Sequence, residues 1–128
     1  MKKTNTKTRT VLKILNEKDI KEIVTVEPAR SIFDALTIMA QYKIGALIVM
    51  KESKMVGIIS ERDYAREIFI EGRSSRDTKV EEIMTKKVLT LSADDKFDKG
   101  LDIMTKKRIR HLPVMHGKEL VGMVSQGD

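Results

Sequence analysis

The stretch "GIISERD", from Gly57 to Asp63, returns later in the chain as "GMVSQGD", from Gly122 to Asp128. Both copies keep the glycine, an apolar pair, the serine and, three residues after the serine, the aspartate. The two glycines stand 65 positions apart, and the same spacing relates further apolar residues. Self-similarity at a fixed period predicts an internal repeat. Pairs at this spacing include Met39 and Met104, Ile44 and Ile109, Leu47 and Leu112, and Val49 and Val114.

A short strand followed by a helix is predicted at the start of each copy. The runs at 22–26 and 87–91 are β-branched or apolar and lead into turn residues, as is typical of strands. Apolar residues at helical spacing then follow from Ile32 and from Phe97. N-cap spacing marks both helix starts, in Ser31 with Asp34 and in Asp95 with Asp98.

A hairpin comes next in each copy. The ranges 44–60 and 109–125 each hold two apolar runs on either side of a polar turn. In the first copy a last helix from Glu61 follows, and Gly72 is expected to stop it. Each unit therefore has the order β-α-β-β-α, which places the chain in the α/β (α+β) class.

The repeat also predicts domain boundaries. "VLKIL" from Val11 matches "VEEIM" from Val80 at a longer spacing, so the first copy holds extra residues near "NEKDIK". We predict a basic flexible tail at 1–8, a first repeat at 9–76, and a second repeat at 77–128 that lacks its final helix. A unit of this size buries little surface alone, so the two repeats are expected to pack as a pair.

Composition indicates a globular protein rather than a disordered or membrane-spanning one. Apolar residues make up 41% of the chain and charged residues 34%. No apolar run approaches the roughly 20 residues that cross a bilayer. The chain has no cysteine, which fits a reducing cytoplasm. The net charge of +6 favours anionic partners, from polyanions to mononucleotides.

The repeated corner has the chemistry of a nucleotide site. A glycine lets a flat ligand approach the strand closely, and a serine at a helix start offers its hydroxyl beside free N–H groups. The aspartate, as a two-oxygen acceptor, suits the neighbouring hydroxyls of a ribose. These residues are Gly57, Ser60 and Asp63 in the first copy, and Gly122, Ser125 and Asp128 in the second.

A simpler interpretation of the corner is helix capping. Ser-x-x-Asp at a helix start is a common cap, which contributes about 1 kcal/mol through the serine. The second copy at a matched place in the repeat favours the ligand site over capping alone. The base of the ligand is then expected against apolar strand residues, namely Val24, Val26, Leu89 and Leu91.

The tandem unit resembles the paired cystathionine-β-synthase (CBS) domains known as a Bateman module. The stretches "IGALIVM…MVGIISERDYARE" and "TKKRIRHLPVM…LVGMVS" carry the resemblance, which covers about residues 11–128. It implies two repeats packed with pseudo-twofold symmetry around a cleft that binds AMP, ADP, ATP, NAD(H) or S-adenosylmethionine. It also implies sensing rather than catalysis, and a homodimer. By motif position, Asp63 and Asp128 are implied to hold ribose, with Ser60 and Ser125 near ribose or phosphate.

The resemblance further implies two unequal sites. In related modules a basic pair before Leu-Pro contacts phosphate, and here that pair is Arg110 and His111. The first copy instead has Gly45 and Ala46, after Ile44, and so lacks this phosphate grip.

Other charged and special residues near the motifs have two interpretations each. Pro113 limits ladder pairing and suits a strand edge or bulge beside a ligand. Arg62 and Arg66 either contact the ligand or form helix-surface ion pairs. The run "KKRIRH" at 106–111 either grips phosphate or complements a helix dipole. The candidate ligand-binding residues are Val24, Val26, Ile44, Gly45, Ala46, Gly57, Ser60, Arg62, Asp63, Arg66, Leu89, Leu91, Arg110, His111, Pro113, Gly122, Ser125 and Asp128.

Three functions compete. The leading one is a regulatory module for AMP or another adenine nucleotide, with no required cofactor and an effector protein that the sequence does not identify. A ligand-free dimerisation scaffold is the second. Nucleic-acid binding is disfavoured because only 4% of residues are aromatic. Neither a Ser-His-Asp signature, a Walker-type loop nor a zinc-ligand spacing is present, which disfavours an enzyme and a metal site.

Overall fold

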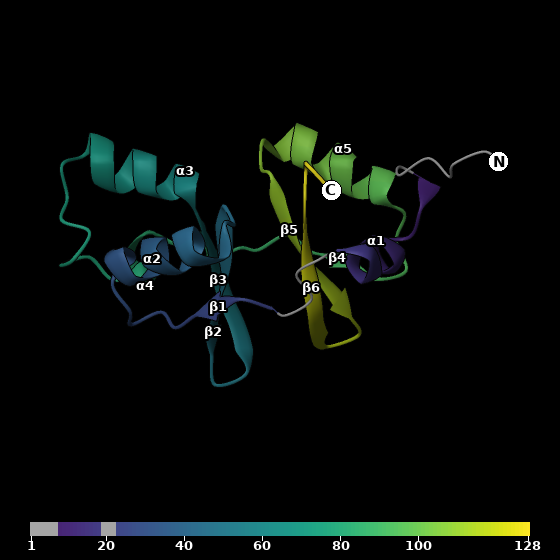
Figure 1. Cartoon of the computed structure of the whole chain (residues 1–128), viewed down its shortest axis with the longest axis horizontal. Coiled ribbons are helices and arrows are strands. Elements are labelled where there is room, and N and C mark those ends of the chain that lie inside the picture. Colours follow the sequence, from purple (N-terminus) through teal and green to yellow (C-terminus); the bar gives the residue numbers. More distant parts are fainter. Residues whose placement is uncertain (1–7, 19–22) are drawn as a thin grey trace. The chain divides into compact units, whose positions relative to one another are not determined.

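The computed structural model describes residues 8–18 and 23–128, which form two compact units (Figure 1). Unit 1 joins Met1–Ile23 to Leu89–Asp128, whereas unit 2 is the continuous segment Val24–Val88. Within the described residues each unit has a three-stranded sheet, in the order β1-β2-β3 in unit 2 and β4-β5-β6 in unit 1. In both sheets the first pair of strands is parallel and the second is an antiparallel hairpin. The predicted α/β class with two similar copies is confirmed.

Unit 2 begins with a strand and a helix that is capped as the sequence predicts. Ser31 Oγ accepts a hydrogen bond from the backbone N–H of Asp34 at 3.1 Å. In the hairpin turn, Glu52 and Ser53 both have positive φ, the conformation that matches the twist of the flanking strands. The elements of unit 2 are β1 (Thr25–Val26), α2 (Ile32–Tyr42), β2 (Ala46–Lys51), β3 (Lys54–Ser60), α3 (Glu61–Asp63), η2 (Tyr64–Ile70) and α4 (Val80–Ile83).

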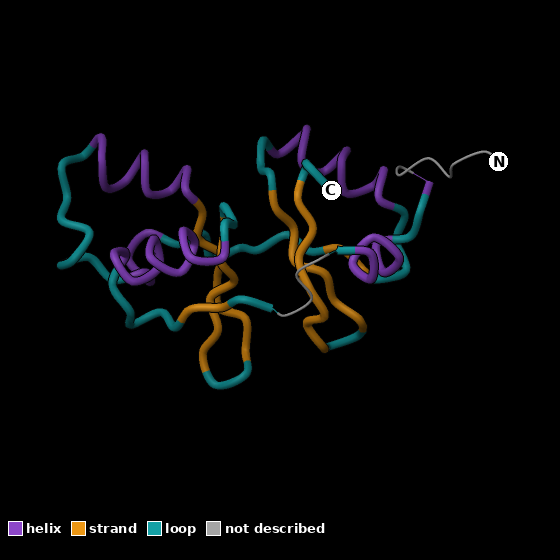
Figure 2. The backbone as a smooth tube through the Cα atoms, in the orientation of Figure 1, coloured by secondary structure: helices purple, strands orange, loops and turns teal. Residues whose placement is uncertain are grey.

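The predicted last helix of the first copy is present, and its second part is a π-helix. α3 continues directly into η2, so that Figure 2 shows one unbroken helix after β3. The backbone N–H of Arg73 donates to the carbonyl of Ile68 at 3.0 Å. Gly72 follows with φ of 70°, and this left-handed residue ends the helix as expected.

Unit 1 repeats this plan with one difference from the sequence-based prediction. Asp95 does not cap the helix of the second copy, because its carboxylate accepts a hydrogen bond from Ser92 N at 2.8 Å in the preceding turn. The helix instead begins at Phe97, and Lys96 precedes it without a side-chain capping bond. The elements of unit 1 are α1 (Val11–Glu17), β4 (Leu91–Ser92), α5 (Phe97–Lys107), β5 (His111–His116) and β6 (Glu119–Ser125).

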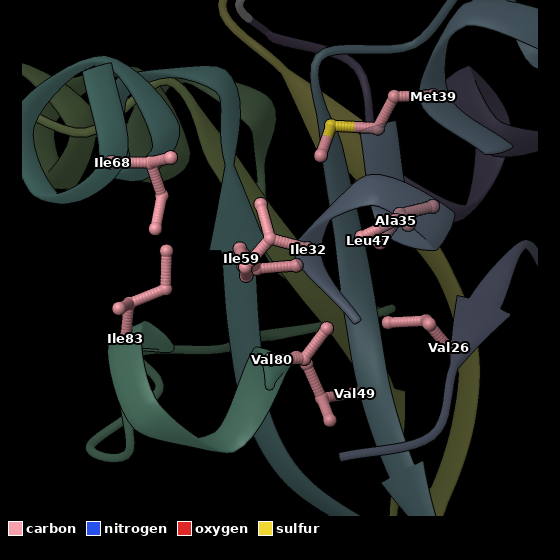
Figure 3. Close-up of a cluster of buried hydrophobic side chains, with 10 residues drawn as sticks. All are labelled: Val26, Ile32, Ala35, Met39, Leu47, Val49, Ile59, Ile68, Val80 and Ile83. Carbon is pink, nitrogen blue, oxygen red and sulfur yellow. The ribbon is translucent and has the colours of Figure 1, made fainter. Parts of the chain in front are cut away.

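Each unit has a core of its own. In unit 2 the buried side chains come from α2, α4, η2 and all three strands (Figure 3). In unit 1 they come from α1, α5, the sheet and the turn after β4. The unit 2 cluster is Val26, Ile32, Ala35, Met39, Leu47, Val49, Ile59, Ile68, Val80 and Ile83, and the unit 1 cluster is Val11, Ile14, Leu91, Ala93, Phe97, Met104, Leu112, Val114 and Val124.

The leading helix of each sequence repeat packs in the unit built around the other repeat's sheet. α1 contacts β6 in unit 1, and α4 contacts β3 in unit 2. Next to α4, Ile58 and Thr85 exchange two backbone hydrogen bonds of 2.9 and 3.0 Å. The repeat boundaries at 9–76 and 77–128 stay a prediction, since the compact units cut across them by this exchange of helices.

Candidate functional site

The Ser60–Asp63 corner of unit 2 is a complete capping box. Ser60 Oγ accepts from the backbone N–H of Asp63 at 3.4 Å, and Asp63 Oδ2 accepts from Ser60 N at 2.9 Å and from Ser60 Oγ at 3.1 Å. Asp63 is only 6% exposed. The other carboxylate oxygen, Oδ1, accepts from Arg66 Nη2 at 3.1 Å. The capping interpretation therefore holds here, and it fixes a buried carboxylate at the end of β3.

The equivalent corner of unit 1 has the same backbone geometry. Ser125 N donates to Asp128 Oδ2 at 2.7 Å, as Ser60 N does to its own aspartate. Just beyond each serine, a backbone N–H donates to the strand opposite, from Gln126 to Arg110 O at 2.9 Å. In unit 2 the corresponding bond runs from Glu61 to Gly45 O at 3.0 Å. The two copies of the motif thus form the same hydrogen bonds. Arg110 occupies in unit 1 the position that Gly45 occupies in unit 2.

Lys18, which the sequence-based analysis does not identify, belongs to the unit 1 corner. Its Nζ donates to Asp128 Oδ2 and to the carbonyl of Met123, both at 3.0 Å. Lys18 follows α1 and is 110 positions away from Asp128 in the chain. The two charges come together because α1 packs on β6, and no local sequence motif indicates this ion pair.

His111 lies beside this ion pair. It is the first residue of β5 and its side chain is half-buried. Burial lowers the pKa of His111, and the charges of Lys18 and Arg110 lower it further, whereas the Asp128 carboxylate raises it. These influences together favour the neutral form of the imidazole. The phosphate grip expected of the Arg110–His111 pair thus has its positive charge on Arg110, whose side chain is exposed.

The two motif glycines have a packing role that the sequence-based interpretation misses. A Cβ on Gly57 would lie 2.6 Å from Met84 Sδ and 2.9 Å from Thr85 O, and one on Gly122 would lie 2.9 Å from Leu15 Cδ2. The space expected for a flat ligand at these two positions is therefore filled by the leading helix or by the residue that follows it. The glycines are needed because a helix packs against the strand there.

Two of the apolar residues expected to hold a base are core residues instead. Val26 lies in β1 and Leu91 in β4, and both side chains are buried in the cores of their own units, whereas Val24 and Leu89 precede these strands. Val24 is half-buried and Leu89 is 42% exposed. Of the four, Val24 and Leu89 alone retain accessible side chains.

Pro113 is expected at a strand edge or beside a bulge, and the structure agrees with the second alternative alone. It lies in β5, the middle strand of its sheet, and pairs with Met123 across the hairpin. The strand-edge interpretation is thus wrong for the strand as a whole. Proline is accommodated because β4 pairs with β5 only from Val114 onwards, and the register shift of the hairpin follows directly after Val114.

The remaining candidates fall around the unit 2 corner. Arg66 forms the helix-surface ion pair that the sequence analysis offered as its alternative. Arg62 is exposed, Ile44 packs against the core cluster, and Ala46 is fully buried. The structure therefore brings together Ser60, Asp63 and Arg66 in unit 2, and it brings together Lys18, Arg110, His111, Ser125 and Asp128 in unit 1.

Comparison with known proteins identifies the family. The family model described as the CBS domain matches residues 17–70 and 80–128. The chain belongs to the CBS domain family. A mitochondrial CBS domain-containing protein of Arabidopsis thaliana, CBSX3, is 45% identical over 77% of this chain and 50% of that protein. The CBS domain-containing protein YhcV of Bacillus subtilis is 29% identical over 84% of this chain and 76% of that protein.

Longer proteins also contain a related CBS segment. An inosine-5'-monophosphate dehydrogenase of Methanocaldococcus jannaschii is 30% identical over 91% of this chain, which spans only 23% of that enzyme. The chain thus spans half or less of two of these three relatives.

Solved structures of CBS proteins share the fold. A protein with CBS domains from Burkholderia ambifaria has a TM-score of 0.90 and 42% identity over 93% of this chain and 89% of that one. The CBS domain pair of protein MJ0100, solved in complex with methylthioadenosine and S-adenosyl-L-methionine, has a TM-score of 0.82 and 30% identity over 94% and 91%. In the part of the chain that the structure describes, no helix is both long and apolar enough to cross a bilayer.

Proposed function

We propose that this CBS domain pair is a regulatory module that binds an adenosine-containing ligand at its Ser60–Asp63 and Ser125–Asp128 corners. The ligand is AMP or another adenine nucleotide, and its ribose hydroxyls donate to the two carboxylates. Binding shifts the conformation of a homodimer, because the ligand has different affinities for two states of the protein. The output goes to an effector protein, and no catalytic step is part of the proposal.

The observation that carries this proposal is the recurrence of one hydrogen-bonding arrangement in two separate corners. Each aspartate accepts from the backbone N–H of the serine three residues earlier, at 2.9 Å in unit 2 and 2.7 Å in unit 1. Helix capping explains the acid of unit 2, and the recurrence of the same bond at the matched corner of unit 1 favours a role that both corners share. The related CBS pair that was solved with two adenosine derivatives supports the same ligand class.

Removing the charge of either aspartate is expected to weaken ligand binding. Asp63→Asn and Asp128→Asn keep an acceptor oxygen for the serine N–H, so both variants retain the corner. They lose charge-assisted bonds to the ribose hydroxyls, which contribute about 1.5–3 kcal/mol. The Kd for AMP is expected to rise about tenfold to hundredfold, as measured by titration calorimetry after a thermal-shift panel of AMP, ATP, NADH and S-adenosylmethionine.

Asp34→Asn is the matched control for these variants. Asp34 also follows a capping serine by three residues, but it lies at the start of α2, outside both corners. Its ligand affinity is expected to equal that of the wild type. A wild-type chain that responds to none of the four ligands would exclude the proposed function, as would an equal loss of affinity in all three variants.

The homodimer in this proposal is expected to form through the exposed end of η2. Phe69 and Ile70 are 75% and 72% exposed, the highest values among the large apolar side chains that the structure describes. In a twofold dimer such a patch meets its own copy, and the charges of both signs around it, on Arg66, Glu67 and Glu71, are then complementary. A CBS-CP12 protein from bloom-forming cyanobacteria, 25% identical to this chain with a TM-score of 0.82, is hexameric.

Phe69→Glu is expected to convert the dimer to a monomer. The substitution would bury two opposed carboxylates at the twofold contact, which costs several kcal/mol. Light scattering should then give the 14.6 kDa of one chain in place of twice that mass. Leu12→Glu, which changes a 45% exposed side chain of α1, should leave the dimer intact. A wild-type monomer, or a Phe69→Glu dimer, would contradict this contact.

The compartment is also part of the proposal. The absence of cysteine and of an apolar bilayer-length run in the sequence favours the cytoplasm. There the module is exposed to the nucleotide pool that it is proposed to sense.

A further inference from the structure

The carboxylate of Asp128 already has a cationic partner from within its own unit. Lys18 Nζ lies 3.0 Å from Asp128 Oδ2, the same oxygen that accepts from Ser125 N. The side chains are 30% and 18% exposed, so water screens the pair only partly. Lys18 Nζ also donates to the carbonyl of Met123, which holds the ammonium over the end of β6.

Among residues 8–18 and 23–128, Asp63 in the corner of unit 2 has no ion pair with a cation from outside the α3–η2 helix. Asp63 is bound by its own helix and strand end, through Ser60 and through Arg66, one turn further along. The side chain of Arg66 is 68% exposed, so this pair is well screened by water. The lysine at the repeat-equivalent position of Lys18, counted from the matched residues Val11 and Val80, is Lys87, whose side chain is exposed.

Two cations, Lys18 and Arg110, act on the His111 ring beside Asp128. Both lower the pKa of His111, which shows that their fields reach the ring at the start of β5. The Asp128 carboxylate raises the pKa of His111, but by less than burial and the two cations together lower it. An uncharged ligand in this corner would meet two cations and one acid, whereas a ligand with a phosphate would restore the balance.

We propose that Lys18 makes the Asp128 corner selective for adenosine ligands that carry a phosphate over uncharged ones. The inference rests on the proposed function, because it assumes that ribose hydroxyls donate to Asp128. Those hydroxyls compete with the Lys18 ammonium for the carboxylate. A 5′-phosphate lies one sugar ring from the hydroxyls, within reach of the flexible four-carbon stem of lysine.

The selectivity follows from an exchange of partners. When a nucleoside monophosphate binds, Lys18 gives up Asp128 and gains the phosphate, so that one ion pair replaces another. When adenosine binds, Lys18 loses its partner and gains none, which lowers the affinity. A cationic ligand gains nothing from Lys18 and is repelled by it. The corner of unit 2, without such a lysine, is expected to discriminate less.

The test measures the AMP and adenosine affinities at each corner separately. The full chain, labelled with ¹⁵N, is titrated with AMP and with adenosine while amide shifts are followed by NMR. The amides of Ser125 and Gly127 report on unit 1, and those of Ser60 and Arg62 report on unit 2. The same titrations are made on Lys18→Met, which removes the charge at similar length, on Lys18→Arg, and on the matched control Lys87→Met.

In Lys18→Met the preference for AMP over adenosine at Ser125 is expected to fall at least about tenfold, with adenosine affinity unchanged or higher. Lys18→Arg should keep the preference, and Lys87→Met should leave it unaltered at both corners. If Lys18 only supported the fold, AMP and adenosine would weaken by the same factor, and this inference would be overturned. An unchanged preference at Ser125, or an equal fall at Ser60, would overturn it too. Binding of neither ligand to the wild type would overturn the proposed function together with this inference.

Discussion

Ile14→Ala is expected to destabilise unit 1 by about 3 kcal/mol while unit 2 stays native. Ile14 is a buried side chain of α1, and truncation of a buried isoleucine to alanine costs about 2–5 kcal/mol in lost transfer energy and cavity formation. Apart from Val11 and Leu15 of its own helix, the core residues around it in unit 1 lie between positions 91 and 124, which follow unit 2 in the sequence. The damage should therefore appear in strands that are remote from position 14 along the chain.

Hydrogen exchange resolved by residue measures this effect. Ile14→Ala should reduce protection in β5 and β6, and the repeat-equivalent Ile83→Ala should reduce it in β2 and β3, where α4 packs. Leu12→Ala is the control, since Leu12 is 45% exposed on the same helix. Loss of protection in β2 and β3 after Ile14→Ala would mean that α1 packs on its own repeat, and the exchange of helices would then be wrong.

Gly57→Ala is expected to cost about 2–3 kcal/mol, as overpacking of a filled site does. The new methyl group would lie 2.6 Å from Met84 Sδ, which can move, and 2.9 Å from the carbonyl oxygen of Thr85, which cannot. The backbone of Thr85 is held in place by its two hydrogen bonds with Ile58, of 2.9 and 3.0 Å. Relief of the clash would therefore break the connection between β3 and the segment after α4.

Gly122→Ala is the matched comparison and should cost about 1 kcal/mol or less. The three atoms nearest to its methyl group all belong to the Leu15 side chain, and the nearest of them, Cδ2 at 2.9 Å, is at the end of that side chain, which can rotate. Alanine also loses less backbone entropy on folding than glycine, which offsets about 0.5–1 kcal/mol. Denaturant unfolding of the two variants measures the difference. An equal or larger loss of stability in Gly122→Ala would contradict the argument from the Thr85 carbonyl.

Local patterns in the sequence predict most of the secondary structure, because each pattern acts through neighbours in the chain. The helix cap at Ser31 and the helix stop at Gly72 are both confirmed. The cap at Asp95 fails because two local uses compete for one carboxylate. The Asp95 carboxylate accepts a hydrogen bond from Ser92 N in the turn after β4, and it therefore does not cap the helix.

Contacts between distant parts of the chain are what the sequence does not reveal. The motif glycines suggest close approach, and approach does occur, but the partners are Met84 and Leu15 rather than a ligand. Nothing in the pattern around Lys18 indicates an ion pair 110 positions away. Such pairs depend on which sheet α1 packs against, and this packing is determined by the hydrophobic core of the whole unit.

Strand faces are the other point at which sequence reasoning is incomplete. Val24 and Val26 are equally apolar, yet Val26 is a core residue and Val24 is half-buried. β1 and β4 have only two paired residues each, and Val24 precedes β1, so no alternation of faces separates Val24 from Val26. The motif residues Ser60, Asp63, Ser125 and Asp128, in contrast, form the predicted corners, because their spacing fixes their hydrogen bonds.

The exchange of leading helices has a consequence for how the protein forms on the ribosome. Unit 2 is one uninterrupted segment, so all its parts have been made once residue 88 has emerged, and it is free to fold at that point. α1 precedes all of unit 2 in the chain, whereas its partner strand β6 follows all of unit 2. α1 therefore cannot pack on β6 until the whole of unit 2 and β6 have been translated, and this long-range contact is expected to be the slow step of folding.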